Sequence, residues 1–399
     1  MTKGAEQAFF RIVPPAGSHA LPLRFEPARG EASTILLPSQ DVTHVLVRLA
    51  MPARVSAGPG ASVSRLSRFA GLISAVQARV LGRPTLPLPR ASASVTLHAA
   101  DRQKRKALRK DLKILKLFGL GAQLLCNEPA VGLALGFSTV PPRRSAHRRS
   151  TLRLGVVAHL HFTDVWADIE ASLACIPDPF GLIVTLTSPN PQVEQAIKAA
   201  YPEARVAVVA NAGRDVRPFL ALLDEGALDG FDIVCKIHSK KSIRDGRPTA
   251  LGELWRRSAL FDLIAGAGRL DEVLERFEAD QHLGLLGPER FRIPNSRFSL
   301  HDAWSGNRDQ TLQMAKLLGL SSDFELDFFA GTMFWVRPTA LTHLRGARLG
   351  DPAAYAPEAG RTDGAVEHAL ERLFTASVKK AGFSLGSLHP LPDVPSEAS

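Results

Sequence analysis

From Leu152 onward, short apolar runs alternate with segments whose apolar residues recur three and four positions apart. The runs predict β-strands over residues 152–159, 181–186, 205–210, 231–237, 283–286 and 328–336. The periodic segments predict helices over residues 165–174, 192–200, 218–223 and 251–279. Strands that alternate with helices favour an α/β domain, in which a mostly parallel sheet carries helices on both faces. Functional residues are expected at the carboxyl ends of the strands, where such sheets bind ligands.

The first 150 residues have a different texture. Short apolar runs over residues 9–13, 21–25, 34–37 and 44–49 are separated by Pro, Gly and Ser, and they predict a small β-rich module. One helix is expected over residues 63–81, and residues 138–151 resemble a linker because Pro-Pro precedes four arginines without apolar periodicity. We therefore expect a β-rich module over 1–100, a basic helix and linker over 101–150, and a larger domain over 151–390.

Residues 101–118 predict a basic amphipathic helix. Leu108, Leu112 and Leu115 recur at helical spacing, whereas lysines and arginines fill the other face. Two interpretations stay open. Either the helix lies on an anionic membrane surface, or its apolar stripe packs on its own domain. Nucleic acid is not an expected partner, because the basic charge lacks interleaved aromatic residues and a recognisable reading module.

Composition and charge narrow the class of protein. The 399 residues are 45% apolar and 22% charged, which is ordinary for a globular protein. Residues 1–150 hold 23 lysines and arginines against 7 acids, a net charge of +16, and the remainder holds 26 against 32, a net charge of −6. This asymmetry favours a basic part that meets an anionic surface. We expect a cytoplasmic protein with peripheral attachment to the inner face of the plasma membrane.

Several classes lose support. The three cysteines form no C-x-x-C pair, which argues against a disulfide framework or structural zinc and favours a reducing compartment. The apolar run at residues 8–10 stops at Arg11, and the uncharged stretch 129–142 has 14 residues, so neither a secretory signal nor a membrane span is expected. Walker A, G-x-G-x-x-G and H-E-x-x-H patterns do not occur in the sequence.

Three polar clusters follow predicted strands and should meet at one edge of the sheet. The first contains His159 and His161, which share one strand face. Together with His238 they are candidates for a metal site; the alternative is one core histidine and one at the polar edge. In the second cluster, Asn211 to Asp215, Arg214 offers a donor fork for a phosphate or carboxylate. The alternative there is a tight turn whose aspartate caps the next helix.

The third cluster follows the strand at 231–237. Two ammonium groups, Lys240 and Lys241, stand beside two serines and suit a pyrophosphate. The alternative is a solvated loop. Further on, Phe334 and Trp335 must point to opposite sides of a strand, so that one stacks on a sugar ring or both lie in the core. Asp363 stands at the mouth of a predicted helix, either as an N-cap or as a general base.

Taken in order, these segments resemble the rhamnan synthesis protein F family of polysaccharide-assembly proteins. The resemblance covers roughly residues 152–385. It rests on VVAHLHFTDVWADI, NAGRDVRPFL, FDIVCKIHSKKS, Trp255-Arg256 after a helix, HLGLLGP, FFAGTMFWVRPTAL and DGAVEHALERLF. Where the family has a second arginine in an NRGRD turn, this chain has Ala212. The resemblance implies a GT-A-like fold and a glycosyltransferase. Its donor would be a nucleotide-sugar carrying rhamnose or a related deoxysugar, and its acceptor a surface polysaccharide or lipid-linked glycan.

The resemblance also implies roles for individual residues. Asp363 is the expected catalytic base of an inverting transfer. The residues expected to bind the nucleotide-sugar are His161, Asn211, Gly213, Arg214, Asp215, Lys236, His238, Ser239, Lys240 and Lys241. The residues expected to bind the sugar or the acceptor are Phe329, Gly331, Met333 and Trp335.

The sequence contains no D-x-D metal pair. We therefore expect no cofactor and no metal ligands, and Lys240, Lys241 and Arg214 neutralise the leaving diphosphate instead. A bound Mg or Mn ion is the alternative. Two other classes stay open: a non-catalytic accessory protein that binds nucleotide-sugar or polymer, and a metal hydrolase that uses the three histidines of the strand-end clusters.

Overall fold

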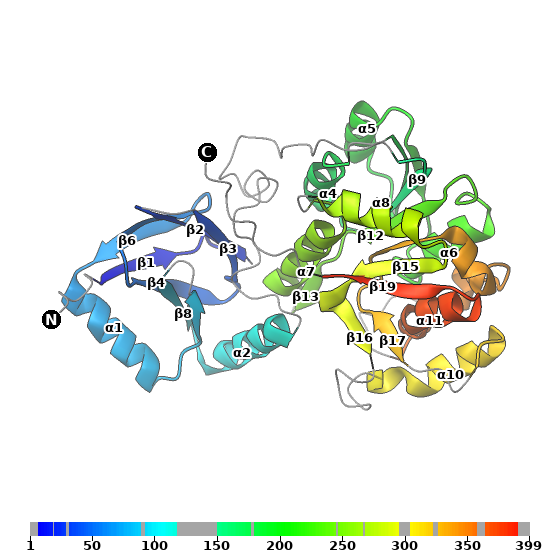
Figure 1. Ribbon diagram of the computed structural model, residues 1–399. Coiled ribbons are helices and arrows are strands. Elements are labelled where there is room, and N and C mark those ends of the chain that lie inside the picture. Colours follow the sequence, from blue (N-terminus) through cyan, green and yellow to red (C-terminus); the bar gives the residue numbers. More distant parts are fainter. Residues whose placement is uncertain are drawn as a thin grey trace. The chain divides into compact units, whose positions relative to one another are not determined.

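The computed structural model describes residues 7–18, 20–28, 32–88, 92–117, 150–176, 179–244, 246–265, 268–294, 304–321, 326–356 and 364–389. The chain divides into two compact units, Met1–Arg143 with Lys240–Ser258, and Arg144–Ser239 with Ala259–Ser399. Each unit is described by itself (Figure 1). No helix among the described residues is long and apolar enough to cross a membrane.

The first unit contains two antiparallel sheets. The larger has the order β6-β1-β4-β8-β7 and comprises β1 (Ala8–Val13), β4 (Val42–Leu49), β6 (Ser62–Leu66), β7 (Thr85–Leu88) and β8 (Ala93–Ala99). The smaller has the order β3-β2-β5 and comprises β2 (Ala20–Pro27), β3 (Ser33–Pro38) and β5 (Ala53–Ala57). Apolar side chains of both sheets form one core. An N-terminal β region is therefore confirmed.

Three helices and a hairpin complete the described part of this unit. They are α1 (Arg68–Val80), α2 (Arg102–Leu117), the pair β13 (Ser242–Arg244) and β14 (Arg247–Thr249), and α7 (Ala250–Leu260). Leu108 of α2 is buried in the core between the sheets, and Leu112 packs against it. Leu108 and Leu112 therefore support the second interpretation of the basic helix, in which its apolar stripe packs on its own domain. Residues 118–149, which include most of the expected linker, lie outside the described residues.

The second unit is built on a seven-stranded sheet with the order β11-β10-β9-β12-β18-β15-β19. All its strands run parallel except β18, which is antiparallel to both neighbours. The strands are β9 (Leu154–Leu160), β10 (Phe180–Leu186), β11 (Arg205–Val208), β12 (Ile233–His238), β15 (Leu283–Pro288), β18 (Phe334–Val336) and β19 (Ser384–Leu388). The expected mostly parallel sheet is confirmed.

The order of the strands creates a switch point between β9 and β12. The chain first moves from β9 outward to β10 and β11, and then returns to place β12 on the other side of β9. Right-handed crossovers put α4 (Trp166–Leu173) and α5 (Pro191–Ala200) on one face and α6 (Val216–Asp224) on the other. Ligands of doubly wound sheets bind at the carboxyl ends of the two strands that flank such a point.

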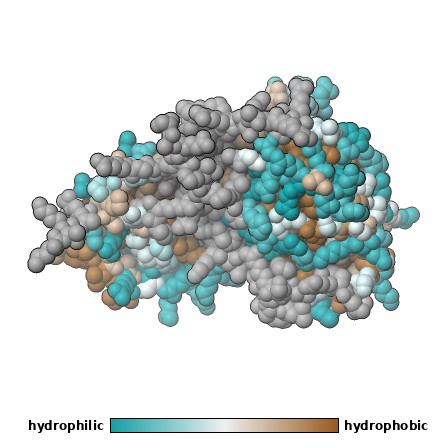
Figure 2. Space-filling model, viewed as in Figure 1, coloured by the Kyte–Doolittle hydropathy of each residue, from teal (hydrophilic) through white to brown (hydrophobic). Residues whose placement is uncertain are grey.

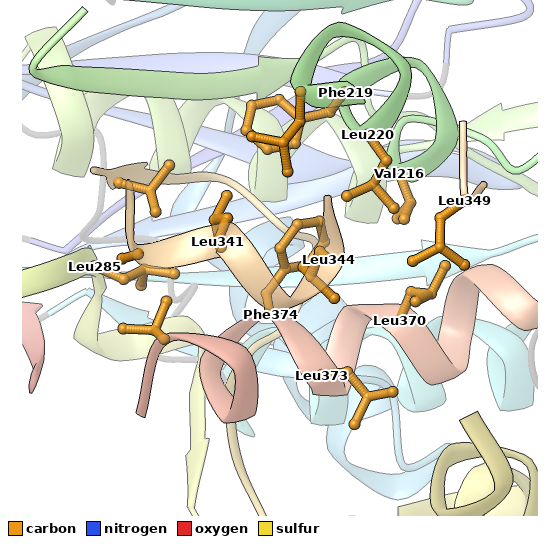
Figure 3. Packing of buried hydrophobic residues seen from close by; sticks show 14 of the residues in the cluster. Val216, Phe219, Leu220, Leu285, Leu341, Leu344, Leu349, Leu370, Leu373 and Phe374 are labelled. Carbon is orange, nitrogen blue, oxygen red and sulfur yellow. The ribbon is translucent and has the colours of Figure 1, made fainter. Parts of the chain in front are cut away.

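One core lies between the sheet and the helices α6 and α11 (Val366–Lys380). Figure 3 shows α6 contributing Val216, Phe219 and Leu220, while α11 contributes Leu370, Leu373 and Phe374. The Phe374 ring lies 6.0 Å from the Phe219 ring and 5.3 Å from that of Phe334. This packing fixes the start of α6 and the first turns of α11 against the sheet.

Shorter elements complete the second unit. They are α8 (Arg269–Ala279), α10 (Arg308–Leu317), the pair β16 (Arg292–Pro294) and β17 (Asp327–Phe329), a π-helical turn η2 (Phe261–Ala265), and the 3₁₀ turns η1 (Thr163–Val165), η3 (Glu289–Phe291), η4 (Ser305–Asn307), η5 (Pro338–Leu344) and η6 (Pro352–Ala354).

Three predicted elements were wrong in extent. The helix expected over 63–81 starts only at Arg68, because Ser67 caps it by accepting from the Ala70 amide at 3.2 Å, and the residues before it form β6. The helix expected over 251–279 is divided into α7, η2 and α8, and Gly268, which directly precedes α8, has a left-handed backbone with φ 68°. The strand expected over 328–336 splits into β17 and β18, because Gly331 and Thr332 form a turn with φ of 84° and 50°.

Candidate functional site

The carboxyl ends of β9 and β12 are tied together at the switch point. The Ser239 amide donates to the His159 carbonyl at 2.8 Å, and the Ser239 hydroxyl accepts from the Phe162 amide at 2.9 Å. Ser239 is buried, so its side chain joins the two loops and is not directed to solvent.

The turn that follows β11 has a left-handed backbone conformation, which glycine adopts more easily than other residues. Gly213 has φ 64° and Arg214 has φ 52°. A Cβ on Gly213 would lie 2.6 Å from the Cβ of Arg217 and from the Tyr355 ring. Glycine is therefore required at this position by packing as well as by backbone angle.

Arg217 fixes this turn from the first turn of α6. Its guanidinium donates to the carbonyls of Ala210 at 3.0 Å, Ala212 at 3.1 Å and Gly350 at 3.1 Å. The side chain is buried, and burial lowers its pKa. Sequence reasoning missed Arg217; the available signal was an arginine close behind a glycine turn, where unpaired carbonyls need donors.

Behind the turn lies a buried ion pair. Lys236 contacts the Asp215 carboxylate, and its ammonium donates to the carbonyl and to the hydroxyl of Thr332, each at 2.9 Å. The Thr332 hydroxyl also donates to Asp215. The rings of Phe219 and Phe334 lie 5.7 Å and 5.9 Å from the ammonium. Lys236 is 1% exposed, so its ammonium neutralises the Asp215 carboxylate and does not face solvent.

Asp215 stays ionised in this environment. Burial alone raises the pKa of a carboxyl group, but the neighbouring His238 and Lys236, with hydrogen bonds from Lys236 and Thr332, outweigh it and hold the pKa of Asp215 below its usual range. The pKa of Lys236 is lowered by burial, and Asp215 opposes that shift.

A second contact set holds the turn at Gly331 and Thr332. His238 Nε2 donates to the Gly331 carbonyl at 2.7 Å, and the Gly331 amide donates to Glu371 Oε1 of α11 at 2.6 Å. The turn is thus fixed between β12 and α11. Glu371 in turn lies 3.6 Å from Arg372, whose guanidinium stacks 4.7 Å from the Phe328 ring.

Arg214 is the cation of this cluster that solvent reaches most easily. Its side chain is 36% exposed, against 2% for Lys236. Its Nη1 lies 3.1 Å from His368 Nε2, and its Nε lies 3.7 Å from Glu367 Oε1, both at the start of α11. The guanidinium therefore lies at the rim of the site, where α11 orients it and solvent reaches part of its surface.

The histidines of the first cluster do not converge on one point. His159 is buried with Nδ1 2.8 Å from the Thr185 hydroxyl, and burial lowers its pKa to about 3. His161 is exposed, with Nδ1 3.0 Å from the Thr187 hydroxyl. Among the residues that the structure describes, no group of three or more His, Cys, Asp or Glu could hold a metal ion.

The aromatic segment expected to bind sugar lies inside the protein. Phe329, Met333 and Trp335 are 2%, 3% and 0% exposed. The Trp335 indole donates to the Leu263 carbonyl at 3.0 Å. Stacking on a sugar needs one free ring face, and these side chains present none at the surface of the described structure.

The remaining predicted residues have varied positions. Asn211 is exposed on the turn. Lys240 and Lys241 belong to the first unit, where the Lys240 ammonium lies 4.6 Å from the Trp255 ring. Their contact with a diphosphate stays a prediction. Asp363 lies outside the described residues; its neighbour Gly364 is held by an amide hydrogen bond of 2.7 Å to Asn307 Oδ1.

Residues 126–383 match the family described as Rhamnan synthesis protein F. The chain belongs to the rhamnan synthesis protein F family. Membership implies a role in the synthesis of rhamnan or a related polysaccharide. The site described above lies within the part that matches the family.

Relatives of this rhamnan synthesis F chain occur in Xanthomonas campestris pv. campestris. Proteins named "Uncharacterized protein WxcX" in strain B100 and in a second strain of that pathovar are each 30% identical to it over 230 residues. The match covers 57% of this chain and 31% of each relative. The chain therefore spans about a third of the length of these relatives.

Proposed function

We propose that this chain is a glycosyltransferase that transfers a sugar from a nucleotide-sugar to a polysaccharide or lipid-linked glycan. The observation that carries the proposal is Arg214, oriented by α11 and partly exposed at the switch point of a parallel sheet. The first four strands of this sheet take the order 3-2-1-4, which is also that of doubly wound nucleotide-binding sheets. That order supports a GT-A-like assignment.

In this proposal Arg214 meets the diphosphate of the donor. A planar guanidinium forms two parallel hydrogen bonds to phosphate oxygens, and it stabilises the negative charge that develops as the sugar–phosphate bond breaks. The buried residues behind it, Arg217 and the pair Asp215–Lys236, keep the turn in one conformation. They are positioning residues, because their polar atoms are already engaged within the fold.

The transfer itself needs one base. The acceptor hydroxyl attacks the anomeric carbon, the bond to the diphosphate oxygen breaks with its electron pair, and a carboxylate takes the hydroxyl proton. We assign this proton to Asp363, on the family resemblance and on its place before α11. Inversion at the anomeric carbon follows from a single displacement. Rhamnose or a related deoxysugar is the sugar that the family's name favours.

The test measures donor binding by thermal shift and transfer by product formation. The full chain is incubated with dTDP-, GDP- and UDP-linked sugars, with and without EDTA. One donor class should raise the unfolding midpoint, and Arg214→Gln should weaken that donor by roughly 10- to 100-fold, the worth of a charge-assisted hydrogen bond. Arg153→Gln is the matched control, because Arg153 precedes β9 at the opposite edge of the sheet and its side chain is 64% exposed.

Equal donor binding by Arg214→Gln and the wild type would refute the proposed site. Loss of the shift with EDTA, and its return with Mn²⁺ or Mg²⁺, would refute a metal-independent transfer.

A non-catalytic accessory protein is the second candidate. It is favoured by the extent to which the charges at the switch point are paired within the fold, as with Asp215 and Lys236. Asp363→Asn separates the two: a transferase should lose turnover while still binding its donor, whereas an accessory protein should keep its cellular activity.

A further inference from the structure

Helix α1 of the first unit is packed with its small residues inward. The only buried residues of α1 are Gly71 and Ala78, two turns apart. A Cβ on Gly71 would lie 2.2 Å from the ring of Phe9 in β1, so the helix backbone approaches the sheet as closely as glycine permits. The inner face of α1 therefore buries little apolar side-chain surface of its own.

The large apolar side chains of α1 point the other way. Phe69 is 76% exposed, Leu72 43%, Ile73 41%, Val76 62% and Val80 80%. At about 100° per residue they form a stripe about 100° wide, opposite Gly71 and Ala78. In Figure 2, brown side chains lie over α1 with hydrophilic ones beside them. Exposed single residues are ordinary, but a contiguous stripe of this kind marks a binding surface.

The surroundings of this α1 stripe are basic. Arg65, Arg68 and Arg79 are exposed around it, and the sequence has no aspartate or glutamate between Asp41 and Asp101. Helix α2 adds to this charge, because its Arg105 donates to the Leu81 carbonyl at the end of α1 at 2.6 Å. The exposed residues of α2 include Lys106, Arg109, Lys110 and Lys113.

We propose that the α1 stripe binds the surface of an anionic lipid bilayer. Its apolar side chains enter the boundary between headgroups and acyl chains, while the arginines meet lipid phosphates. An apolar stripe on a helix whose only charged residues are arginines complements a surface that is apolar within and anionic outside. This inference is independent of the proposed transferase chemistry. It also places membrane contact on α1, whereas Leu108 and Leu112 of α2 face their own core.

The test is flotation of the full chain with vesicles of equal parts phosphatidylcholine and phosphatidylglycerol, and with pure phosphatidylcholine. Binding is expected to the anionic vesicles and to fall as salt is raised. Phe69→Ser combined with Val76→Ser should weaken partitioning by about tenfold per residue removed. Leu317→Ser is the matched control, because Leu317 is 79% exposed at the end of α10; it should bind as the wild type does.

A further pair of variants tests the charge. Arg68→Gln with Arg79→Gln should reduce binding to anionic vesicles and flatten its salt dependence, with the stripe itself intact. Since all these side chains are exposed, the variants should keep the wild-type unfolding midpoint, which is measured alongside. Unchanged flotation of the Phe69/Val76 variant would overturn the proposal. So would light scattering that shows the stripe buried in a dimer which the same variant dissociates, since the occupant would then be a second copy of the chain.

Discussion

Replacing Lys236 by methionine tests whether the buried pair holds the switch point together. Methionine has nearly the same length and keeps the contacts with the rings of Phe219 and Phe334, so the change removes mainly the charge and its hydrogen bonds. The Asp215 side chain is only 13% exposed. Its remaining polar neighbours would be the Thr332 hydroxyl, which donates to it, and His238 Nε2, which lies 3.9 Å away. A buried charge left without its partner costs about 3–5 kcal/mol.

That cost is large against the roughly 5–15 kcal/mol that stabilises a typical domain. The second variant, Lys236→Met with Asp215→Leu, removes both charges, and its cost should be smaller than that of the single change, because no buried charge is left unpaired. Lys198→Met is the control: this exposed lysine donates to the Ala204 carbonyl from the end of α5, and its loss should cost less than about 1 kcal/mol.

Urea unfolding followed by tryptophan fluorescence measures these energies. A Trp255→Phe background confines the signal to the second unit, where Trp335 is wholly buried. A cost for Lys236→Met within about 1 kcal/mol of the Lys198→Met control would refute the view that the pair exists to neutralise Asp215. A double variant that costs as much as Lys236→Met alone, or more, would refute it too.

Two further predictions concern each unit in turn. Burial, aided by nearby arginines, lowers the pKa of His44 to about 4 and that of His98 to about 3. Both histidines stay neutral in the fold and take up protons on unfolding. The free energy of unfolding of the first unit should therefore fall by up to about 1.4 kcal/mol per pH unit per histidine as the pH falls from about 6.5 toward 4. In urea titrations His98→Gln should reduce this slope, and an unchanged slope would contradict the prediction. Gly213→Ala should destabilise the second unit by about 1–3 kcal/mol more than Gly319→Ala, because both have positive φ but only Gly213 has neighbours within 4 Å; equal losses would show that the clash is relieved.

The strands around the switch point were predictable because each is mostly apolar and buried along its whole length. β9 and β12 appear within two residues of their predicted ends, and the polar residues behind them do share an edge. The same criterion gave a wrong prediction over residues 328–336, where one strand was expected. The apolar content of that run does not reveal the left-handed turn at Gly331 and Thr332. β19, with the sequence SLGSL, was missed because its serines and glycine carry no strand signal.

Pairings across the site could not be predicted. Lys236 and Asp215 are 21 positions apart, and Lys236 reaches Thr332 across 96. Alternation along a strand tells which face Lys236 lies on. It does not tell whether that face meets an incoming ligand or an aspartate of the same protein. The same limit applied to Arg217, whose three carbonyl partners come from the turn before it and from Gly350.

The division of the chain has a consequence for how the protein is made and cut. The segment Lys240–Ser258 belongs to the first unit although it is inserted in the sequence of the second. A ribosome therefore completes the first unit only after it has made β9 and β12, so neither unit can be finished before the other has begun. A fragment that starts at residue 150 would carry β13, β14 and most of α7 as an orphaned insertion. To produce the second unit alone, residues 240–258 should be deleted and Ser239 joined to Ala259 through a short linker.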